Sequence, residues 1–300
     1  MTVVRHLLEV DDLTGPELSH VLDLAEVGEL PQVLAGRGVA LLFEKASLRT
    51  RNAAEMAVVQ LGGHPVSLRG EEVGLDQRES AADLARVLSG YHAAVGARVV
   101  HHATLERMAS ASLVPVVNLL SDVAHPTQAL ADLLTIRQRF GSLAGRQLAW
   151  VGDANNVFRS LSLGAAMAGM AVRAACPRGY GPDAAHLARV QALGGEVLVT
   201  SVPEEAVGGA DVVSTDVWTS MGQESEAERR RLAFAGFTVD RRLMAGAGPG
   251  AVLLHCLPAH RGEEVAAEVL DGAQSLVWAQ AENRMHVIRG LLAFLFEVGG

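Results

Sequence analysis

Short apolar runs alternate with stretches of helical periodicity along most of the chain. The run at 39–43 is typical of a buried strand, and apolar positions in 52–59 recur at helical spacing. Other apolar runs of strand length lie at 64–68, 93–100, 114–119, 147–151, 172–175, 197–200, 211–214 and 251–254. Strands that alternate with helices favour parallel sheets with right-handed crossovers. The pattern therefore predicts an α/β fold.

The length of 300 residues exceeds the roughly 100–200 residues of a usual domain, so we expect two domains. A long helical pattern at 126–140 is followed by Gly141-Ser142, where we place the boundary. A second strand and helix series follows, and a final apolar helix spans 285–296. We predict two doubly wound parallel-sheet domains that are linked by long crossing helices.

The composition is that of an ordinary globular protein, with 49% apolar and 20% charged residues. A formal net charge of −9 argues against nucleic acid or an anionic membrane as partner. The two cysteines are too few for a disulfide framework, and no apolar run reaches the about 18 residues of a membrane span. The first ten residues include Arg5, His6 and Glu9, unlike a signal peptide. We expect a cytoplasmic protein.

Candidate chemistry is densest between Phe43 and Arg51, where a strand passes into a helix. Ser47 and Thr50 lie at that turn, where helix amides and the positive end of the helix dipole point outwards. Such a turn binds anions, phosphate above all, and Arg49 can bind phosphate oxygens in bidentate fashion. A capped helix start with solvated arginines is the alternative.

Two further polar clusters follow strands in the first half. Arg98 lies near the end of the 93–100 strand, and His125-Pro126-Thr127-Gln128 begins the long helix after the 114–119 strand. Parallel sheets bind ligands beyond the carboxyl ends of their strands. We therefore expect these clusters to contribute to one site.

The second half has its own strand-edge groups. The turn 152–156 has only Gly152 where a dinucleotide site needs Gly-x-Gly-x-x-Gly, so Asn155 and Asn156 are better suited to a small polar ligand. Asp216 could bind a cationic amine, with helix capping or solvation as the alternative. His255 and Cys256 follow the last strand. The stretch 69–79, rich in charge and glycine, predicts an exposed loop that is either a lid or a connector.

Three kinds of chemistry could use these groups. A zinc site at His255 and Cys256 is disfavoured, because neighbouring residues rarely chelate one ion and no Cys-x-x-Cys or His-x-x-x-His supports them. A Cys256 nucleophile would lack a helix N-terminus to lower the pKa of its thiol. Transfer of a group from a small phosphorylated donor to an amine uses every cluster.

The motifs Phe-Glu-Lys-x-Ser-x-Arg-Thr-Arg, His-Pro-Thr-Gln, Asp-x-Trp-x-Ser-Met-Gly and His-Cys-Leu-Pro occur here in that order. In this respect the chain resembles the ornithine carbamoyltransferases over about residues 7–295. The first two motifs mark carbamoyltransferases generally. The segments 216–222 and 255–258 point to ornithine as the acceptor.

The resemblance implies a role for each motif. Residues 1–140, joined by the C-terminal helix 284–300, would bind carbamoyl phosphate, and residues 141–283 would form a Rossmann-like ornithine-binding domain. The implied carbamoyl-phosphate ligands are Ser47, the backbone of Leu48, Arg49, Thr50, Arg98, His125, Gln128, the Leu257 carbonyl and Arg284. The implied ornithine ligands are Asn156, Asp216, Ser220, Met221 and Cys256, and the implied catalytic residues are Arg98, His125, Asp216 and Cys256.

The resemblance also implies a mechanism without metal, cofactor or covalent intermediate, in which positioning and electrostatics supply the rate. Ornithine and carbamoyl phosphate would give citrulline and phosphate, a step of arginine biosynthesis, in a homotrimer or a larger assembly of trimers. Two alternatives remain open: the same chemistry on acetylornithine or putrescine, and a non-catalytic regulatory paralogue.

Two positions depart from the family pattern. Leu48 stands where a Thr is usual, and a lost hydroxyl hydrogen bond to phosphate corresponds to about 0.5–1.5 kcal/mol. We expect weaker donor binding, not its loss, because the backbone still donates. Gly74 stands where Gln or His is common, which puts in doubt the contact that this loop would make with a neighbouring subunit.

Overall fold

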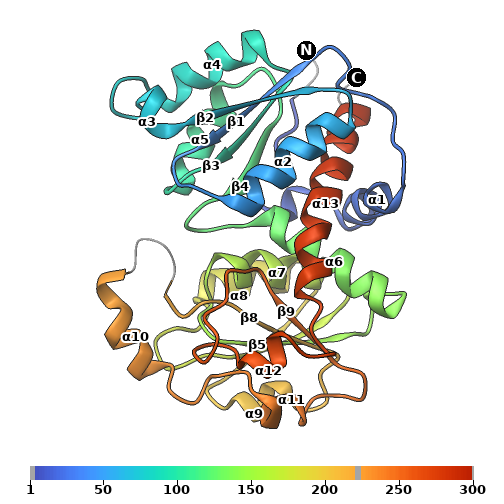
Figure 1. Cartoon of the computed structure of the whole chain (residues 1–300), viewed down its shortest axis with the longest axis vertical. Coiled ribbons are helices and arrows are strands. Elements are labelled where there is room, and N and C mark those ends of the chain that lie inside the picture. The colour runs from blue at the N-terminus through green and yellow to red at the C-terminus, as the bar shows by residue number, and fades with distance from the viewer. Residues whose placement is uncertain (1–3, 220–223, 299–300) are drawn as a thin grey trace. The chain divides into compact units, whose positions relative to one another are not determined.

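The computed structural model describes residues 4–219 and 224–298. The chain divides into two compact units, Met1–Leu134 with Glu282–Gly300, and Thr135–Ala281. The predicted boundaries lay at 140/141 and 283/284. The observed boundaries fall inside two long helices, α6 (Pro126–Phe140) and α13 (Val277–Val298), which carry the chain from one unit to the other (Figure 1).

The first unit contains a four-stranded parallel sheet in the order β2-β1-β3-β4. Its elements before α6 are η1 (Val10–Asp12), α1 (Gly15–Glu26), β1 (Gly38–Phe43), α2 (Leu48–Gln60), β2 (His64–Arg69), α3 (Gly70–Val73), α4 (Ala81–Tyr91), β3 (Ala94–Arg98), α5 (His102–Ala111) and β4 (Val116–Leu120).

Helices cover both faces of this sheet, because successive side chains of a strand point to opposite sides. Leu42 of β1 belongs to a buried cluster with Leu84 of α4 and Leu105 of α5. Leu41, on the other face, borders a small apolar void together with residues of α2 and α13, among them Val58. The domain is doubly wound, as predicted.

The second unit contains a five-stranded parallel sheet in the order β7-β6-β5-β8-β9. Its elements between α6 and α13 are β5 (Gln147–Val151), α7 (Asn156–Met167), β6 (Ala171–Ala175), α8 (Ala184–Ala192), β7 (Val197–Thr200), α9 (Pro203–Val207), β8 (Val212–Thr215), η2 (Glu224–Glu226), α10 (Ala227–Ala233), α11 (Arg241–Met244), β9 (Val252–His255) and α12 (Ala267–Leu270).

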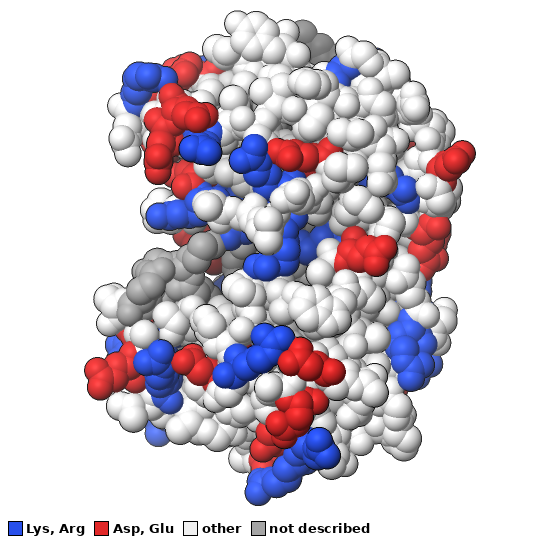
Figure 2. Space-filling model, viewed as in Figure 1, with Lys and Arg blue, Asp and Glu red and all other residues white. Residues whose placement is uncertain are grey.

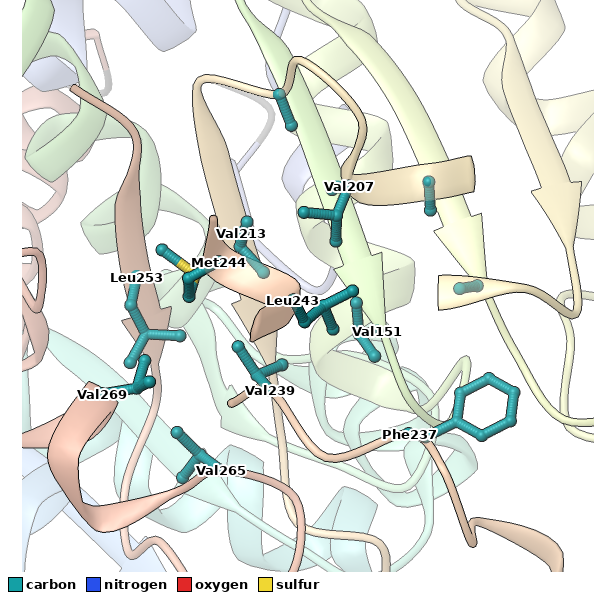
Figure 3. Close-up of a cluster of buried hydrophobic side chains, with 14 of the residues drawn as sticks. Val151, Val207, Val213, Phe237, Val239, Leu243, Met244, Leu253, Val265 and Val269 are labelled. Carbon is teal, nitrogen blue, oxygen red and sulfur yellow. The ribbon is translucent and has the colours of Figure 1, made fainter. Parts of the chain in front are cut away.

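The second sheet is also covered on both faces. Figure 3 shows the buried cluster to which Val151 of β5 belongs, with side chains from α9, α11 and α12, including Leu243 and Val269. The preceding residue, Trp150, packs on the other face against Phe158 of α7, with ring centroids 5.5 Å apart. The alternation inside one strand therefore positions helices on both sides.

Each sheet has a point where the strand order reverses. In the first unit the chain leaves β1 toward β2 and then returns to β3, so the reversal lies between β1 and β3. In the second unit it lies between β5 and β8. Open parallel sheets bind ligands at the carboxyl ends of the strands that flank such a reversal. Every strand predicted above overlaps an observed one, and 147–151 and 197–200 coincide with β5 and β7.

The loop predicted at 69–79 is partly helical. Helix α3 occupies Gly70–Val73, where two glutamates in the first turn favour the helix N-terminus. Gly74 ends the helix at a φ of 65°, a left-handed conformation that glycine adopts without steric cost. Leu75 then enters the core that covers β1, so this segment is anchored as well as exposed.

No helix in residues 4–219 and 224–298 is both long and apolar enough to cross a membrane. Figure 2 shows basic and acidic side chains interspersed over the visible face. Exposed basic and acidic side chains form several pairs, for example Arg51 with Glu55 and Arg261 with Asp271.

Candidate functional site

The amino end of α2 lies at the carboxyl edge of the first sheet, directly after β1. The Ser47 hydroxyl caps the helix and accepts a hydrogen bond from the Thr50 amide at 3.3 Å. The amides of Leu48 and Arg49 belong to the first helical turn, which has no acceptors within the helix, so they can donate to an anion. The Leu48 side chain is 75% exposed. The presence of Leu at position 48, where Thr is usual, therefore leaves the backbone N–H donors of this turn in place.

Guanidinium groups from distant parts of the chain meet at this helix end. Arg98, the last residue of β3, is buried and donates from one nitrogen to the hydroxyls of Ser47 and Thr50, each at 3.3 Å. Arg284 of α13 is also buried and donates to the same Thr50 hydroxyl at 2.5 Å. The Arg49 Nε is buried and has no hydrogen-bond partner among the described residues. This concentration of positive charge favours an anionic ligand.

His125 precedes α6 and is buried beside these arginines. Burial, and then the positive charges of Arg284 and Arg98, hold the pKa of the His125 imidazole well below its ordinary value. Its Nε2 lies 3.3 Å from an Arg284 nitrogen, and a guanidinium can only donate. In this arrangement Nε2 therefore accepts, and the single ring proton lies on Nδ1, 3.5 Å from the Thr127 hydroxyl.

Gln128 follows in the first turn of α6 and is fully buried. Its amide nitrogen donates to Oδ1 of Asp132 at 2.7 Å, and Asp132 is fully buried one turn further along the helix. The Gln128 Oε1 is buried and accepts no hydrogen bond from the described residues. Such an atom favours a ligand that brings an N–H group.

The second unit has a carboxylate at its own reversal point. Asp216 follows β8 and is buried. The Cys256 thiol, just after β9, donates to Asp216 Oδ1 at 3.0 Å, and the Asn155 amide donates to Oδ2 at 2.7 Å. Asn155 also caps α7 through its carbonyl oxygen. The arrangement fixes a negative charge and a thiol side by side.

The residues around Cys256 are held by a buried histidine. His255 Nδ1 accepts a hydrogen bond from the Leu257 amide at 2.9 Å, so its Nε2 carries the proton and donates to Glu264 at 3.0 Å. Leu257 has a φ of 57°, which is unfavourable for a residue with a side chain. The buried pair of His255 and Glu264 therefore stabilises a strained backbone beside the thiol.

Asp216, His255 and Cys256 also form one of the groups whose ligand atoms lie within 4.8 Å of one another. Both ring nitrogens of His255 are engaged, one with the Leu257 amide and one with Glu264. A metal ligand needs a free lone pair on one of them. The hydrogen bonds therefore disfavour a metal at this position.

The predicted residues divide between the two units. Ser47, Arg49, Thr50, Arg98, His125, Gln128 and Arg284 belong to the first unit, whereas Asn156, Asp216, Cys256 and Leu257 belong to the second. Asn156 is the first residue of α7 and is half-buried. Ser220 and Met221 lie outside the described residues.

Sequence reasoning missed several residues that hold these groups. Asn155 was considered only as a ligand residue, yet it bonds Asp216. Asp132 follows Gln128 by four residues, a helical spacing that could have indicated their contact. Glu264 had no such signal, because its bond to His255 depends on the path of an irregular loop.

Comparison with known proteins assigns both units to one family. Residues 5–138 match the family described as aspartate/ornithine carbamoyltransferase, carbamoyl-P binding domain. Residues 144–295 match its Asp/Orn binding domain.

Individual relatives match over nearly their full length. The chain is 50% identical to an ornithine carbamoyltransferase of Acidothermus cellulolyticus, covering 99% of this chain and 98% of the relative. The crystal structure of ornithine carbamoyltransferase from Thermus thermophilus is 45% identical, with a TM-score of 0.90 over 98% of this chain and 100% of that chain. The ornithine carbamoyltransferase structure from Pyrococcus furiosus is 42% identical, with a TM-score of 0.92 over 98% of both chains.

Replacing Arg98 should weaken anion binding at the α2 N-terminus. A hydrogen bond to a charged group contributes about 1.5–3 kcal/mol, so we expect Arg98→Met to bind inorganic phosphate about 10-fold to 100-fold more weakly in titration calorimetry. Arg51→Met is the matched control, because Arg51 is exposed and paired with Glu55. An equal loss in both variants would show a general charge effect and contradict the site.

Acidification should destabilise the protein through His125. The folded pKa is depressed, so below the unfolded value of 6.5 the unfolded state binds the extra proton. As the pH is lowered below this value, the free energy of unfolding should decrease until the folded pKa is reached. This residue should contribute a decrease of at most about 1.4 kcal/mol per pH unit. Urea unfolding at neutral and mildly acidic pH should show a smaller loss for His125→Asn than for the unmodified protein. Identical losses would exclude this contribution.

Proposed function

The chain belongs to the aspartate/ornithine carbamoyltransferase family, and from this premise we propose that it transfers the carbamoyl group of carbamoyl phosphate to the δ-amine of L-ornithine, giving L-citrulline and phosphate. The proposal is supported above all by the different charged groups that the two units hold at their strand ends. One unit concentrates guanidinium groups at a helix N-terminus, and the other holds a carboxylate against a thiol.

The donor would bind to the first unit through its phosphate. The amides of Leu48 and Arg49, the Ser47 and Thr50 hydroxyls and the Arg98 guanidinium are the proposed partners. Hydroxyl groups can accept from an arginine and donate to a phosphate oxygen at the same time. Binding would thus keep the contacts that Arg98 and Thr50 already make. Arg284 would add positive charge beside the same hydroxyl.

The chemical step is attack of the neutral δ-amine on the carbamoyl carbon. A C–N bond forms, negative charge develops on the carbamoyl oxygen, and the C–O bond to phosphate then breaks, while one N–H proton of the attacking amine passes to the departing phosphate. Thr50, Arg98 and His125 would donate to this oxygen, an electrostatic stabilisation that favours the transition state over the ground state. His125 is kept neutral by its surroundings and has one N–H to donate. A donation from Nε2 requires Arg284 to release this nitrogen and the proton to move from Nδ1.

The acceptor would bind to the second unit. Asp216 would attract the α-amino group, and Asn156 with Ser220 and Met221 would hold the rest of the amino-acid head. The Cys256 S–H donates to Asp216, and these two groups together would help to set the protonation of the δ-amine. The carbonyl of Leu257, set by His255, would accept from the carbamoyl N–H₂. No metal or cofactor has a part in this scheme.

The protein should synthesise citrulline from ornithine and carbamoyl phosphate, and Asp216→Asn should lower kcat/KM for ornithine. Loss of a charged hydrogen bond predicts a decrease of about 10-fold to 100-fold, with unchanged phosphate affinity of the first unit. A colorimetric citrulline assay and phosphate calorimetry measure the two effects. Asp211→Asn, which removes a carboxylate paired with Arg146 elsewhere in the same unit, is the control.

Each negative result has a distinct meaning. Turnover of acetylornithine or putrescine but not ornithine would retain the donor assignment and refute the acceptor. Phosphate binding without turnover of any amine would indicate the non-catalytic regulatory paralogue. Failure to bind either phosphate or carbamoyl phosphate would refute the donor assignment itself.

We also propose a cytoplasmic homotrimer. Both cysteines are free thiols, which suits a reducing compartment. Leu48, Met56 and Val59 expose 75%, 46% and 49% of their surface at helical spacing along α2, and such an apolar stripe suits a contact between copies.

Light scattering should give the mass of three chains, and Met56→Glu should shift the protein toward the mass of one chain. Glu106→Lys on the exposed face of α5 is the charge-changing control. A single-chain mass for the unmodified protein would contradict the trimer.

A further inference from the structure

The hydrogen bond between Gln128 and Asp132 affects which donor molecules can bind to the first unit. A glutamine amide has one oxygen acceptor and one N–H₂ donor of nearly equal size, so its two orientations fill the same space. Packing alone therefore cannot decide which end faces a ligand. A hydrogen bond from a neighbour that accepts only, or donates only, can decide it.

Asp132 is such a neighbour. An ionised carboxylate has acceptors only, and Oδ1 of Asp132 lies 2.7 Å from the Gln128 nitrogen. The reverse orientation would put the Gln128 oxygen against this carboxylate, two acceptors in contact with both side chains fully buried. Burial makes that repulsion costly, because water cannot screen it. The amide is thereby held with Oε1 directed away from Asp132.

The Gln128 Oε1 is buried and accepts no hydrogen bond from the described residues. A donor analogue with a methyl group in place of N–H₂ would leave this oxygen unpaired, whereas the N–H₂ group would pair it. Sites with a buried hydrogen-bonding group reject a ligand that lacks the partner more strongly than apolar pockets reject a change in size.

We propose that Asp132 is a positioning residue that fixes the amide orientation of Gln128, an inference that rests on the proposed function. As a result, the donor site would select an amide over the corresponding methyl ketone. Asp132 itself contacts no substrate in this proposal. It acts through Gln128, and its loss should affect recognition of the N–H₂ group but not of the phosphate.

The test compares two stable analogues of the donor, phosphonoacetamide and acetonylphosphonate. They differ only at one group, which is N–H₂ in phosphonoacetamide and CH₃ in acetonylphosphonate. Calorimetry gives the dissociation constant of each for the full-length protein. The unmodified protein should prefer the amide by about tenfold, the scale of one buried polar group left unpaired. Asp132→Leu should bring this ratio close to one with little change for the ketone. Asp132→Asn should give an intermediate ratio, because its amide can accept from Gln128 or donate to it.

Thr104→Val is the matched control, because it removes a buried polar group of the same unit that bonds Asp76 and not Gln128. Its ratio should equal that of the unmodified protein. A ratio retained in both Asp132 variants would overturn the proposal, as would equal weakening of both ligands in Asp132→Leu, which a purely structural role predicts. If circular dichroism shows that Asp132→Leu does not fold, Asp132→Asn decides: a reduced ratio supports the proposal and an unchanged one overturns it.

The unmodified protein separates this inference from the function on which it depends. If it binds phosphonoacetamide no better than acetonylphosphonate, the assignment of Gln128 to the carbamoyl group is wrong and the inference is overturned with it. If it shows the preference and the Asp132 variants keep it, only the role of Asp132 is wrong.

Discussion

Two buried guanidinium groups that donate to one hydroxyl group are the constraint on which the first unit depends. Arg98 and Arg284 both bond Thr50, although they come from the end of a strand and from the last helix. Holding like charges together away from water costs free energy, which an anion bound at the α2 N-terminus would offset. Burial first, and then the same charges, hold the pKa of His125 below its ordinary value and keep the imidazole neutral, so the arrangement that favours an anion also limits how the imidazole can donate.

The second unit has a negatively charged side chain, Asp216, at the equivalent point of its own sheet. Asp216 lies where the strand order reverses, as Arg98 does in the first unit: Arg98 is the last residue of β3, and Asp216 is the first residue after β8. Asn155 and Cys256 each donate one hydrogen bond to the Asp216 carboxylate, and neither adds a positive charge. The carboxylate therefore keeps its attraction for a cationic amine. In the proposed scheme, an anionic donor and an amino-acid acceptor would therefore bind to separate units.

Local periodicity was sufficient to predict the strands and the clusters at their ends, because each is a property of a few consecutive residues. It did not predict helix α3, where first-turn glutamates and Gly74 outweighed the loop-like composition. Contacts between distant residues were also beyond it: Arg284 and Thr50 lie 234 positions apart, and only the resemblance to a family joined them. Asn155 and Glu264 were missed because they bond other site residues instead of a ligand.

The placement of α13 bears on the order in which the protein can be assembled during synthesis. The second unit is a continuous stretch, Thr135–Ala281, whereas the first needs Glu282–Gly300 to be complete. Domains fold as their residues leave the ribosome, and closing a longer loop costs more entropy. The second unit can therefore fold while the residues that begin the chain still lack their helix. The N-terminus of α2, although made early, acquires Arg284 only after the whole second unit has emerged.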